Sequence, residues 1–292
     1  MEEENLAKLL GDILLIEANE LIRLYKDKKW RKNIVILDAS WYLPNVKREP
    51  FKEFKNTHLP DALYFDIDEV SDTSSNLPHT IPTIKQFEFN MEKLGINNNS
   101  HIVIYSMDGI GTSPRAWWLF KLYKHKNISI LNGGMRAWKS INGPVNNKIS
   151  KIYKTSYKAD LDHSILIKYD DLKNFYNNKN YQVVDARSHG RFIGIEDEPR
   201  PGLQKGHIPN SINIPFNLLI NDQGYLINKN KIIEVLNKYN FNYEKIIIST
   251  CGSGVTACVL AFALEFIGKK SWKVYDGSWS EWGQKGNKLI EV

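Results

Sequence analysis

The chemistry that this sequence can support centres on Cys251, a cysteine that is followed by two glycines in a short loop. It comes after the β-branched run at 246–248, which is typical of a parallel strand buried on both faces. The apolar residues from Val255 to Phe266 then recur at helical spacing, and Gly268 predicts the end of that helix. We therefore expect Cys251 to lie between a buried strand and a helix.

A loop in this setting can hold an anionic, nucleophilic sulfur. The first amides of a helix have no acceptor within the helix and carry the positive end of its dipole. Because Gly252 and Gly254 lack Cβ atoms, the backbone can curl so that several N–H groups converge on one point. We predict an activated thiolate at Cys251; the alternative is a small buried hydrophobic residue. For Cys258, on the apolar stripe of the helix, we predict a core position.

Composition indicates a globular protein. Hydrophobic residues make up 42% of the 292-residue chain and charged residues 25%. The two cysteines are too few for a disulfide framework or a cysteine-rich zinc site. The cysteine loop also lacks the glycine pattern of a dinucleotide site and the Gly-Lys of a phosphate-binding loop. We therefore expect neither a metal nor a cofactor.

Charge and hydropathy argue against two classes of partner. The formal net charge is +6, but the lysines are scattered among asparagines, so we expect no direct binding of nucleic acid. No apolar run approaches the roughly 20 residues of a membrane span, so we expect no membrane partner. The acidic start at residues 2–4 opposes a mitochondrial presequence. We expect a cytoplasmic protein, with the mitochondrion as the alternative.

Four short motifs each occur twice, in the same order in both copies. They are Asp38-Ala39 with Asp185-Ala186, His58-Leu59-Pro60 with His207-Ile208-Pro209, residues 101–105 with 245–249, and residues 131–138 with 275–282. Within each copy, β-branched runs alternate with segments of helical period. This arrangement predicts two tandem α/β domains, each a mainly parallel sheet flanked by helices.

The repeat also predicts domain limits. We expect an N-terminal domain at 1–145 with a helical extension over about 1–30, a polar linker at 146–163, and a catalytic domain at 164–292. Residues 6–24 have the pattern of an amphipathic helix.

The first copy has no cysteine at the place of the cysteine loop. Ser106 or Ser113 could serve as a nucleophile there, but the sequence shows no histidine and acid beside them. We therefore expect the nucleophilic chemistry in the second copy.

From about residue 34 to residue 282, the chain resembles the two-domain rhodanese family, in which an inactive first domain packs on a catalytic second one. The resemblance rests on the paired motifs, on Gly-Met-Arg-Ala-Trp at 134–138 and Gly-Ser-Trp-Ser-Glu-Trp at 277–282, and on the cysteine loop. The loop is similar to that of the subfamily that uses 3-mercaptopyruvate. The thiosulfate-using subfamily carries Arg-Lys in place of Gly252-Ser253. The resemblance implies that the loop residues Gly252, Gly254, Val255 and Thr256 bind substrate.

A substrate with a remote carboxylate needs a cation, and the segment at 190–200 contains Arg191 and Arg200. A guanidinium group matches a carboxylate in bidentate geometry. The resemblance implies that both arginines bind substrate; the alternative is local pairing with the acidic residues at 196–198. Arg187 is the weaker candidate, because Ser40 stands at its place in the first copy.

The resemblance also implies a set of residues that manage protons. In the mercaptopyruvate-using subfamily, a serine two residues after the cysteine works with an aspartate and a histidine of the first domain; these match Ser253, Asp68 and His79. On spacing alone, Asp66 and Asp68 share one face of a strand, so the residues themselves do not decide between them. The alternative for His79 is an ordinary loop histidine.

The implied activity is transfer of sulfane sulfur from 3-mercaptopyruvate, through a persulfide on Cys251, to cyanide or to a thiol acceptor such as thioredoxin, with release of pyruvate. One alternative is a thiosulfate sulfurtransferase, and another is a persulfide donor or sulfur carrier for tRNA thiolation. Phosphatases share the domain fold, but their loop needs one more residue and an arginine where Ala257 stands.

Overall fold

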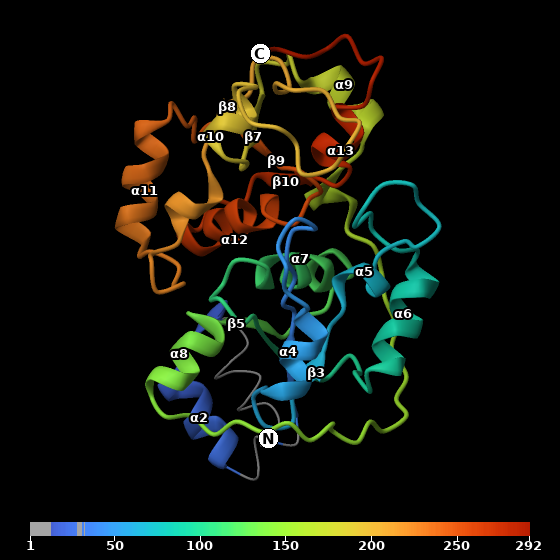
Figure 1. Ribbon diagram of the computed structural model, residues 1–292, viewed down its shortest axis with the longest axis vertical. Helices are drawn as coiled ribbons and strands as arrows, with labels where there is room; N and C mark the ends of the chain where they lie inside the picture. The colour runs from blue at the N-terminus through green and yellow to red at the C-terminus, as the bar shows by residue number, and fades with distance from the viewer. Residues whose placement is uncertain (1–12, 28–30, 32) are drawn as a thin grey trace.

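The computed structural model describes residues 13–27, 31 and 33–292, and within them the chain forms two five-stranded sheets (Figure 1). The strands of the first are β1 (Leu15–Ile16), β2 (Ile34–Asp38), β3 (Leu63–Tyr64), β4 (His101–Tyr105) and β5 (Ile128–Leu131). Those of the second are β6 (Leu166–Ile167), β7 (Tyr181–Asp185), β8 (Ile212–Asn213), β9 (Ile246–Thr250) and β10 (Trp272–Tyr275). The orders β1-β5-β4-β2-β3 and β6-β10-β9-β7-β8 are equivalent, and all pairings are parallel. The predicted tandem α/β fold is confirmed.

Helices connect the strands in both halves. The first half contains α2 (Ala18–Lys26), α4 (Pro50–Asn56), α5 (Ile67–Val70), α6 (Ile84–Lys93), α7 (Ser113–Leu122) and α8 (Gly134–Ser140). The second contains α9 (Tyr169–Phe175), α10 (His189–Phe192), α11 (Lys229–Lys238), α12 (Ala257–Ile267) and α13 (Ser278–Trp282), with short 3-10 turns at His163–Ile165 and Phe216–Leu219.

Alternate side chains of the central strands pack into different cores. In β4, Ile102 and Ile104 join the cluster that contains residues of α6 and α7, whereas Val103 joins the cluster with residues of α2 and α8. In β9, Ile247 and Ile248 are likewise divided between two clusters. A strand covered on both faces needs apolar residues at consecutive positions, which explains its continuous β-branched sequence.

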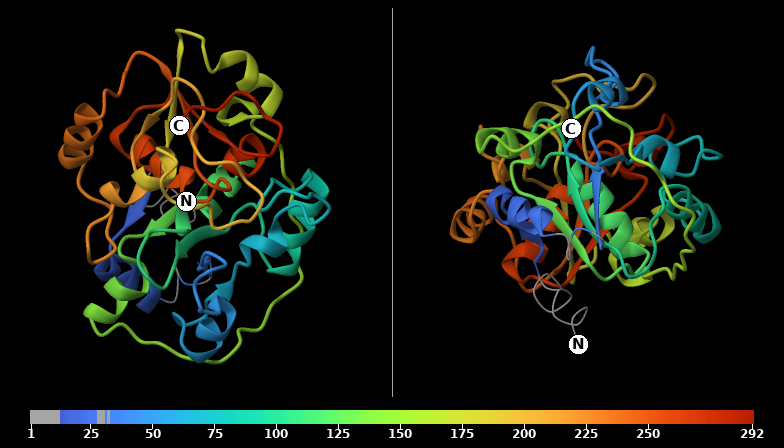
Figure 2. Two further views of the ribbon diagram at one scale, coloured as in Figure 1. Left: turned by 45° about the horizontal axis from the view of Figure 1, so that its top comes forward. Right: turned by 90° about the horizontal axis from the view of Figure 1, so that it is seen from below.

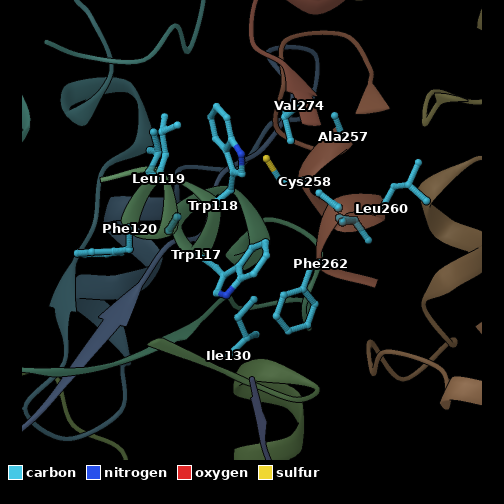
Figure 3. Packing of buried hydrophobic residues seen from close by; sticks show 14 of the residues in the cluster. Trp117, Trp118, Leu119, Phe120, Ile130, Ala257, Cys258, Leu260, Phe262 and Val274 are labelled. Carbon is cyan, nitrogen blue, oxygen red and sulfur yellow. The ribbon is translucent and has the colours of Figure 1, made fainter. Parts of the chain in front are cut away.

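One of these cores continues from the first half into the second. Helices α7 and α12 pack against each other at the junction, where Trp117 meets Phe262 edge-to-face with ring centroids 4.9 Å apart (Figure 3). Cys258 of α12 lies beside Trp118 in the same contact and is fully buried, so its predicted core position is confirmed (Figure 3). Helix α12 starts at Ala257 and ends at its left-handed cap Gly268, as predicted from the glycine.

The N-terminal prediction is wrong in part. Residues 6–12 of the expected helix lie outside the described residues. Leu15 and Ile16 form strand β1, which pairs with β5, and the helix begins only at Ala18. A short apolar run fits a strand as well as a helix, and here the open edge of a sheet provides its partner.

The segment at 146–163 runs along the outside of the first half (Figures 1 and 2). Asn146 exchanges backbone hydrogen bonds with His58, and the amide of Tyr157 donates to Glu92. Tyr157 is fully buried and stacks on His125. The segment is therefore attached to the first domain by both backbone and side-chain contacts.

Candidate active site

Cys251 follows the last residue of β9 and borders a cavity of about 730 Å³ between the two halves. The site lies at the carboxyl end of a parallel strand, where open α/β sheets bind ligands. Both halves line the cavity: Trp41 and Thr112 contribute from the first, and Arg191 and Arg200 from the second. The Cys251 residue is only 2% exposed. A reactant must therefore reach it through the cavity.

In the cysteine loop, the backbone N–H groups at 252–256 lack hydrogen-bond acceptors in the described chain, whereas two of the carbonyls are hydrogen-bonded. None of the amides at 252–256 donates a hydrogen bond to another residue of the described chain. The carbonyls are occupied instead: that of Gly252 accepts from the Ser280 amide at 2.8 Å, and that of Gly254 from the Cys258 thiol at 3.1 Å. Five consecutive N–H groups are thus left for an anion, which agrees with the predicted cradle.

Four of the five residues in this stretch, Gly252, Ser253, Val255 and Thr256, line the cavity. Gly254 does not. Its φ of +79° is a backbone conformation that suits glycine, and a Cβ there would lie 2.9 Å from Nη1 of Arg115. Gly254 therefore determines the backbone conformation of the loop and lies against Arg115, outside the cavity lining.

Helix α13 fixes the cysteine itself. The Cys251 amide donates to Oγ of Ser278 at 3.2 Å, and the carbonyl of Cys251 accepts from the Trp279 amide at 2.9 Å. The Oγ of Ser280 adds a bond of 2.7 Å to the Gly252 carbonyl. The Gly-Ser-Trp-Ser-Glu-Trp motif at 277–282 thus holds the cysteine loop in place.

Ser253, His79 and Asp68 form one hydrogen-bonded chain across the junction. Nδ1 of His79 lies 2.9 Å from Oγ of Ser253, and Nε2 lies 2.8 Å from Oδ1 of Asp68. Because a carboxylate only accepts, Nε2 carries the proton of the neutral ring, and the Ser253 hydroxyl donates to Nδ1. His79 and Asp68 do not line the cavity, so Ser253 is the end of the chain that meets it.

Two pKa shifts favour this protonation state. Burial lowers the pKa of His79 below its ordinary value, and the bond to Asp68 opposes that shift. The same bond to His79 lowers the pKa of Asp68. At neutral pH, the chain therefore holds a neutral imidazole next to a carboxylate.

Asp66 and Asp68 have different positions, so the expectation that they share a strand face is wrong. Strand β3 ends at Tyr64, and Asp66 is the N-cap of α5, accepting from the amides of Asp68 and Glu69. Asp68 lies inside that short helix and turns towards His79. The reason is that an Asp with free amides two and three residues later caps a helix in preference to extending a strand.

The two predicted substrate arginines differ in their partners. Arg191 forms a bidentate pair with Glu198, with Nε–Oε1 and Nη2–Oε2 distances of 3.1 and 2.5 Å. A local ion pair, which the acidic residues at 196–198 allow, is thus present at Arg191. Arg200 has no ion pair within 4 Å in the described structure, and burial lowers its pKa. Arg187 pairs with Asp185 and Glu198 and is fully buried.

Sequence reasoning missed Trp41. Its Nε1 donates to Oδ2 of Asp68 at 3.2 Å, its ring packs edge-on against His79, and the Arg200 guanidinium lies 6.0 Å from its centre. Trp41 thus joins the proton chain to the arginine side of the cavity. Its position after β2, at the carboxyl edge of the sheet, is the signal that could have identified it.

Arg115 is a second missed residue. Its fully buried guanidinium donates to the His79 carbonyl, to the Gly254 carbonyl at 3.4 Å and to Oδ1 of Asp276 at 3.1 Å. The other oxygen of Asp276 accepts from the Ile81 amide at 2.8 Å. One arginine therefore links the histidine loop of the first half to the cysteine loop of the second.

Other chemistries find less support in the described part of the chain. Ser106 and Ser113 bond to each other at 2.8 Å, and Ser106 also donates to the Gly109 carbonyl, so both stabilise a turn. Across the described ranges, no group of three or more histidine, cysteine or acidic side chains could hold a metal ion. No helix in these ranges is long and apolar enough to cross a membrane.

Comparison with known proteins shows the family of the chain. The family model of the rhodanese-like domain matches residues 17–141 and 168–285. The chain is 37% identical to the 3-mercaptopyruvate sulfurtransferase of Homo sapiens over 92% of its own length and 91% of the relative's. It is 36% identical to the thiosulfate sulfurtransferase of Rattus norvegicus, with the same coverage. The crystal structure of the 3-mercaptopyruvate sulfotransferase SseA from Escherichia coli is similar with a TM-score of 0.83 and 31% identity, over 92% of this chain and 100% of that one.

Proposed function

This chain belongs to the rhodanese family, and on that premise we propose that it transfers sulfur from 3-mercaptopyruvate, through a persulfide on Cys251, to a thiol. The observation that carries the proposal is the Ser253–His79–Asp68 chain, which ends beside an uncharged cysteine loop. Such a loop suits a donor whose negative charge lies away from the reacting sulfur.

The first half-reaction forms the persulfide. The Cys251 thiolate attacks the sulfur of 3-mercaptopyruvate, the S–S bond forms, and the C–S bond breaks with its electron pair moving to carbon. The resulting enolate takes up a proton and leaves as pyruvate. The free amides at 252–256 stabilise the developing negative charge, and Ser253 exchanges protons with the substrate while His79 and Asp68 fix its hydroxyl.

Arg200 and Arg191 bind the carboxylate end of the substrate in this scheme. Arg200 is half-buried, lines the cavity and has no described carboxylate partner, so its guanidinium is available. The Nη1 atom of Arg191 has no bond to any described residue, although Glu198 pairs with Nε and Nη2 of the same guanidinium group.

The transfer is split into two covalent steps, and each step breaks only one bond to sulfur.

The second half-reaction returns the enzyme to its thiolate. An acceptor thiolate, such as that of thioredoxin, attacks the outer sulfur of the persulfide, the new S–S bond forms, and Cys251 leaves as thiolate. Both cysteines are free thiols, which suits a reducing compartment such as the cytosol.

Thiosulfate is the second candidate donor, because a relative of nearly equal identity is named for it. Against it, positions 252 and 253 carry no cation here. One experiment decides: pyruvate release from 3-mercaptopyruvate and sulfite release from thiosulfate are measured with the same purified protein. We expect kcat/KM to be at least about tenfold higher for 3-mercaptopyruvate; equal values or a preference for thiosulfate would refute the proposal.

A further inference from the structure

Three arginines gather on one side of Cys251, and buried carboxylates compensate two of them. Nη2 of Arg187 lies 2.6 Å from Oδ2 of Asp185, and both side chains are almost completely buried. Glu198 contacts both Arg187 and Arg191 while only 4% of its side chain is exposed. Buried charges of this kind are screened little by solvent, so each pair matters to the field in the cavity.

Glu198 is a bridge between two arginines. Its Oε1 accepts from Nη1 of Arg187 at 2.7 Å and from Nε of Arg191 at 3.1 Å, and its Oε2 accepts from Nη2 of Arg191. The Arg191 guanidinium lies against the cysteine loop, because Nη2 is 2.9 Å from the place of a Cβ on Gly252. The charge of Glu198 is therefore felt where the donor anion must bind.

The buried and half-buried groups leave one net positive charge on this side of the cavity; Glu196 and Asp197 also line it, but both are exposed to solvent. Three guanidinium groups, of Arg187, Arg191 and Arg200, face the two carboxylates of Asp185 and Glu198. Asp68 is a further carboxylate near Arg200, but 63% of its side chain is exposed and it bonds to His79 and Trp41. Solvent screens its charge more than that of Glu198.

We propose that Glu198 determines donor specificity by limiting the positive charge beside Cys251 to the amount that matches a monoanion. At neutral pH, 3-mercaptopyruvate carries one negative charge and thiosulfate carries two. With Glu198 ionised, the positive charge of the site balances the single negative charge of 3-mercaptopyruvate but only half of the charge of thiosulfate. This inference rests on the proposed function, because it concerns the choice between donors of the same reaction.

The direct test is Glu198→Gln, which keeps the shape of the side chain and removes its charge. An added unit of positive charge favours a dianion over a monoanion, so we expect the ratio of kcat/KM for thiosulfate to kcat/KM for 3-mercaptopyruvate to rise by about tenfold or more. The gain for thiosulfate should weaken as salt is added. Loss of structure alone would lower both values and leave no such gain.

Asp197→Asn is the matched control. It removes the same charge from the neighbouring residue of the same loop, but the Asp197 side chain is 90% exposed and pairs with Lys205. We expect this variant to change the donor ratio by less than about twofold. If the two variants shift the ratio equally, the burial and contacts of Glu198 are irrelevant and the inference is wrong.

The outcomes separate this inference from the proposed function. If the parent protein releases no pyruvate from 3-mercaptopyruvate, the function fails. If the parent is active but Glu198→Gln leaves the ratio unchanged or lowers it, only the inference fails. If Glu198→Gln does not fold, Glu198→Asp serves instead: it keeps the charge, so the ratio should hold while both kcat/KM values fall, and a shift towards thiosulfate would overturn the inference.

Discussion

At the residue scale, the surroundings of His79 favour the neutral imidazole that could accept the proton of Ser253 in the proposed mechanism. It has a left-handed φ of +61°, and its ring is enclosed by Ser253, Asp68 and Trp41. Positive φ is uncommon for a residue other than glycine, and it persists only where surrounding contacts enforce it. The bond of the His79 carbonyl to Arg115 provides such a contact.

The pH dependence of the reaction tests this role. A base acts in its neutral form, so activity should persist above the lowered pKa of His79 and fall as the pH drops through it. Asp68→Asn removes the charge that favours the imidazolium, so the acidic limb of kcat/KM should move to lower pH. The plateau should drop by about tenfold or more because the ring loses its orientation.

The control for this experiment is Glu69→Gln. This variant removes a charge from the exposed neighbour of Asp68 on the same helix. Its pH profile should match that of the parent. An acidic limb that stays in place or moves to higher pH in Asp68→Asn would show that His79 is not the titrating base.

Sequence reasoning predicted the residue types of the site better than their partners. Cys251 and the buried Cys258 could be predicted from the strand and the helical period, because those patterns are local. The bond between Ser253 and His79 joins residues of different domains, and only family resemblance suggested it. The pairing of Arg191 with Glu198, in preference to the other acids of the segment, depends on backbone geometry that no residue pattern encodes.

At the element scale, the site depends on how loops are fixed to helices. The cysteine loop is bound by α13 on one side and by Arg115 on the other. The sequence predicted the helix that follows the loop, but it did not indicate the role of Arg115, because an arginine usually lies at the surface. Its burial follows from the packing of α7 on α12, a contact between domains.

A double-mutant cycle measures this link. Arg115→Met and Asp276→Asn break a buried pair that also serves two backbone carbonyls, so we expect a coupling free energy of about 2 kcal/mol in urea unfolding. The same cycle on the exposed pair Lys124 and Asp160 should give little or no coupling, because solvent screens both charges. Equal coupling in both cycles would contradict a special role for Arg115.

At the scale of the whole molecule, the two halves insert equivalent loops into each other. His79 precedes the helix cap Thr83 by the same number of residues as Gly224 precedes the helix cap Asn228. The His79 loop meets the cysteine loop through the His79–Ser253 bond. The Gly224 loop meets the corresponding loop of the first half, where the Ile110 amide donates to the Gly224 carbonyl at 3.0 Å.

A matched pair of side chains anchors the two loops. Oδ2 of Asp276 accepts from the Ile81 amide, and Oδ1 of Asn132, at the corresponding place after β5, accepts from the Leu226 amide at 3.0 Å. The loop of the first half that lacks a cysteine thus serves the interface. These bonds and the Ser253–His79 bond cross the same junction between the two domains.

Gly224→Ala tests the interface. Its φ is +87°, and a Cβ would lie 2.7 Å from the Asp108 carbonyl oxygen across the junction. We expect a loss of about 2–4 kcal/mol of unfolding free energy, from backbone strain and overpacking together. Gly268→Ala has a similar φ of +91° with nothing within 4 Å, so it should lose only about 1 kcal/mol. Equal losses of unfolding free energy in the two variants would mean that the Gly224 loop is not closely packed against the first half.

Peptide mass spectrometry tests most directly whether Cys251 carries the transferred sulfur. The protein is mixed with 3-mercaptopyruvate without an acceptor, and the masses of the peptides that contain Cys251 and Cys258 are measured after separation. We predict one added sulfur atom on Cys251, an unchanged Cys258, and one pyruvate released per persulfide. An unmodified Cys251 in protein that still turns over 3-mercaptopyruvate, or undiminished pyruvate release by Cys251→Ser, would contradict the account.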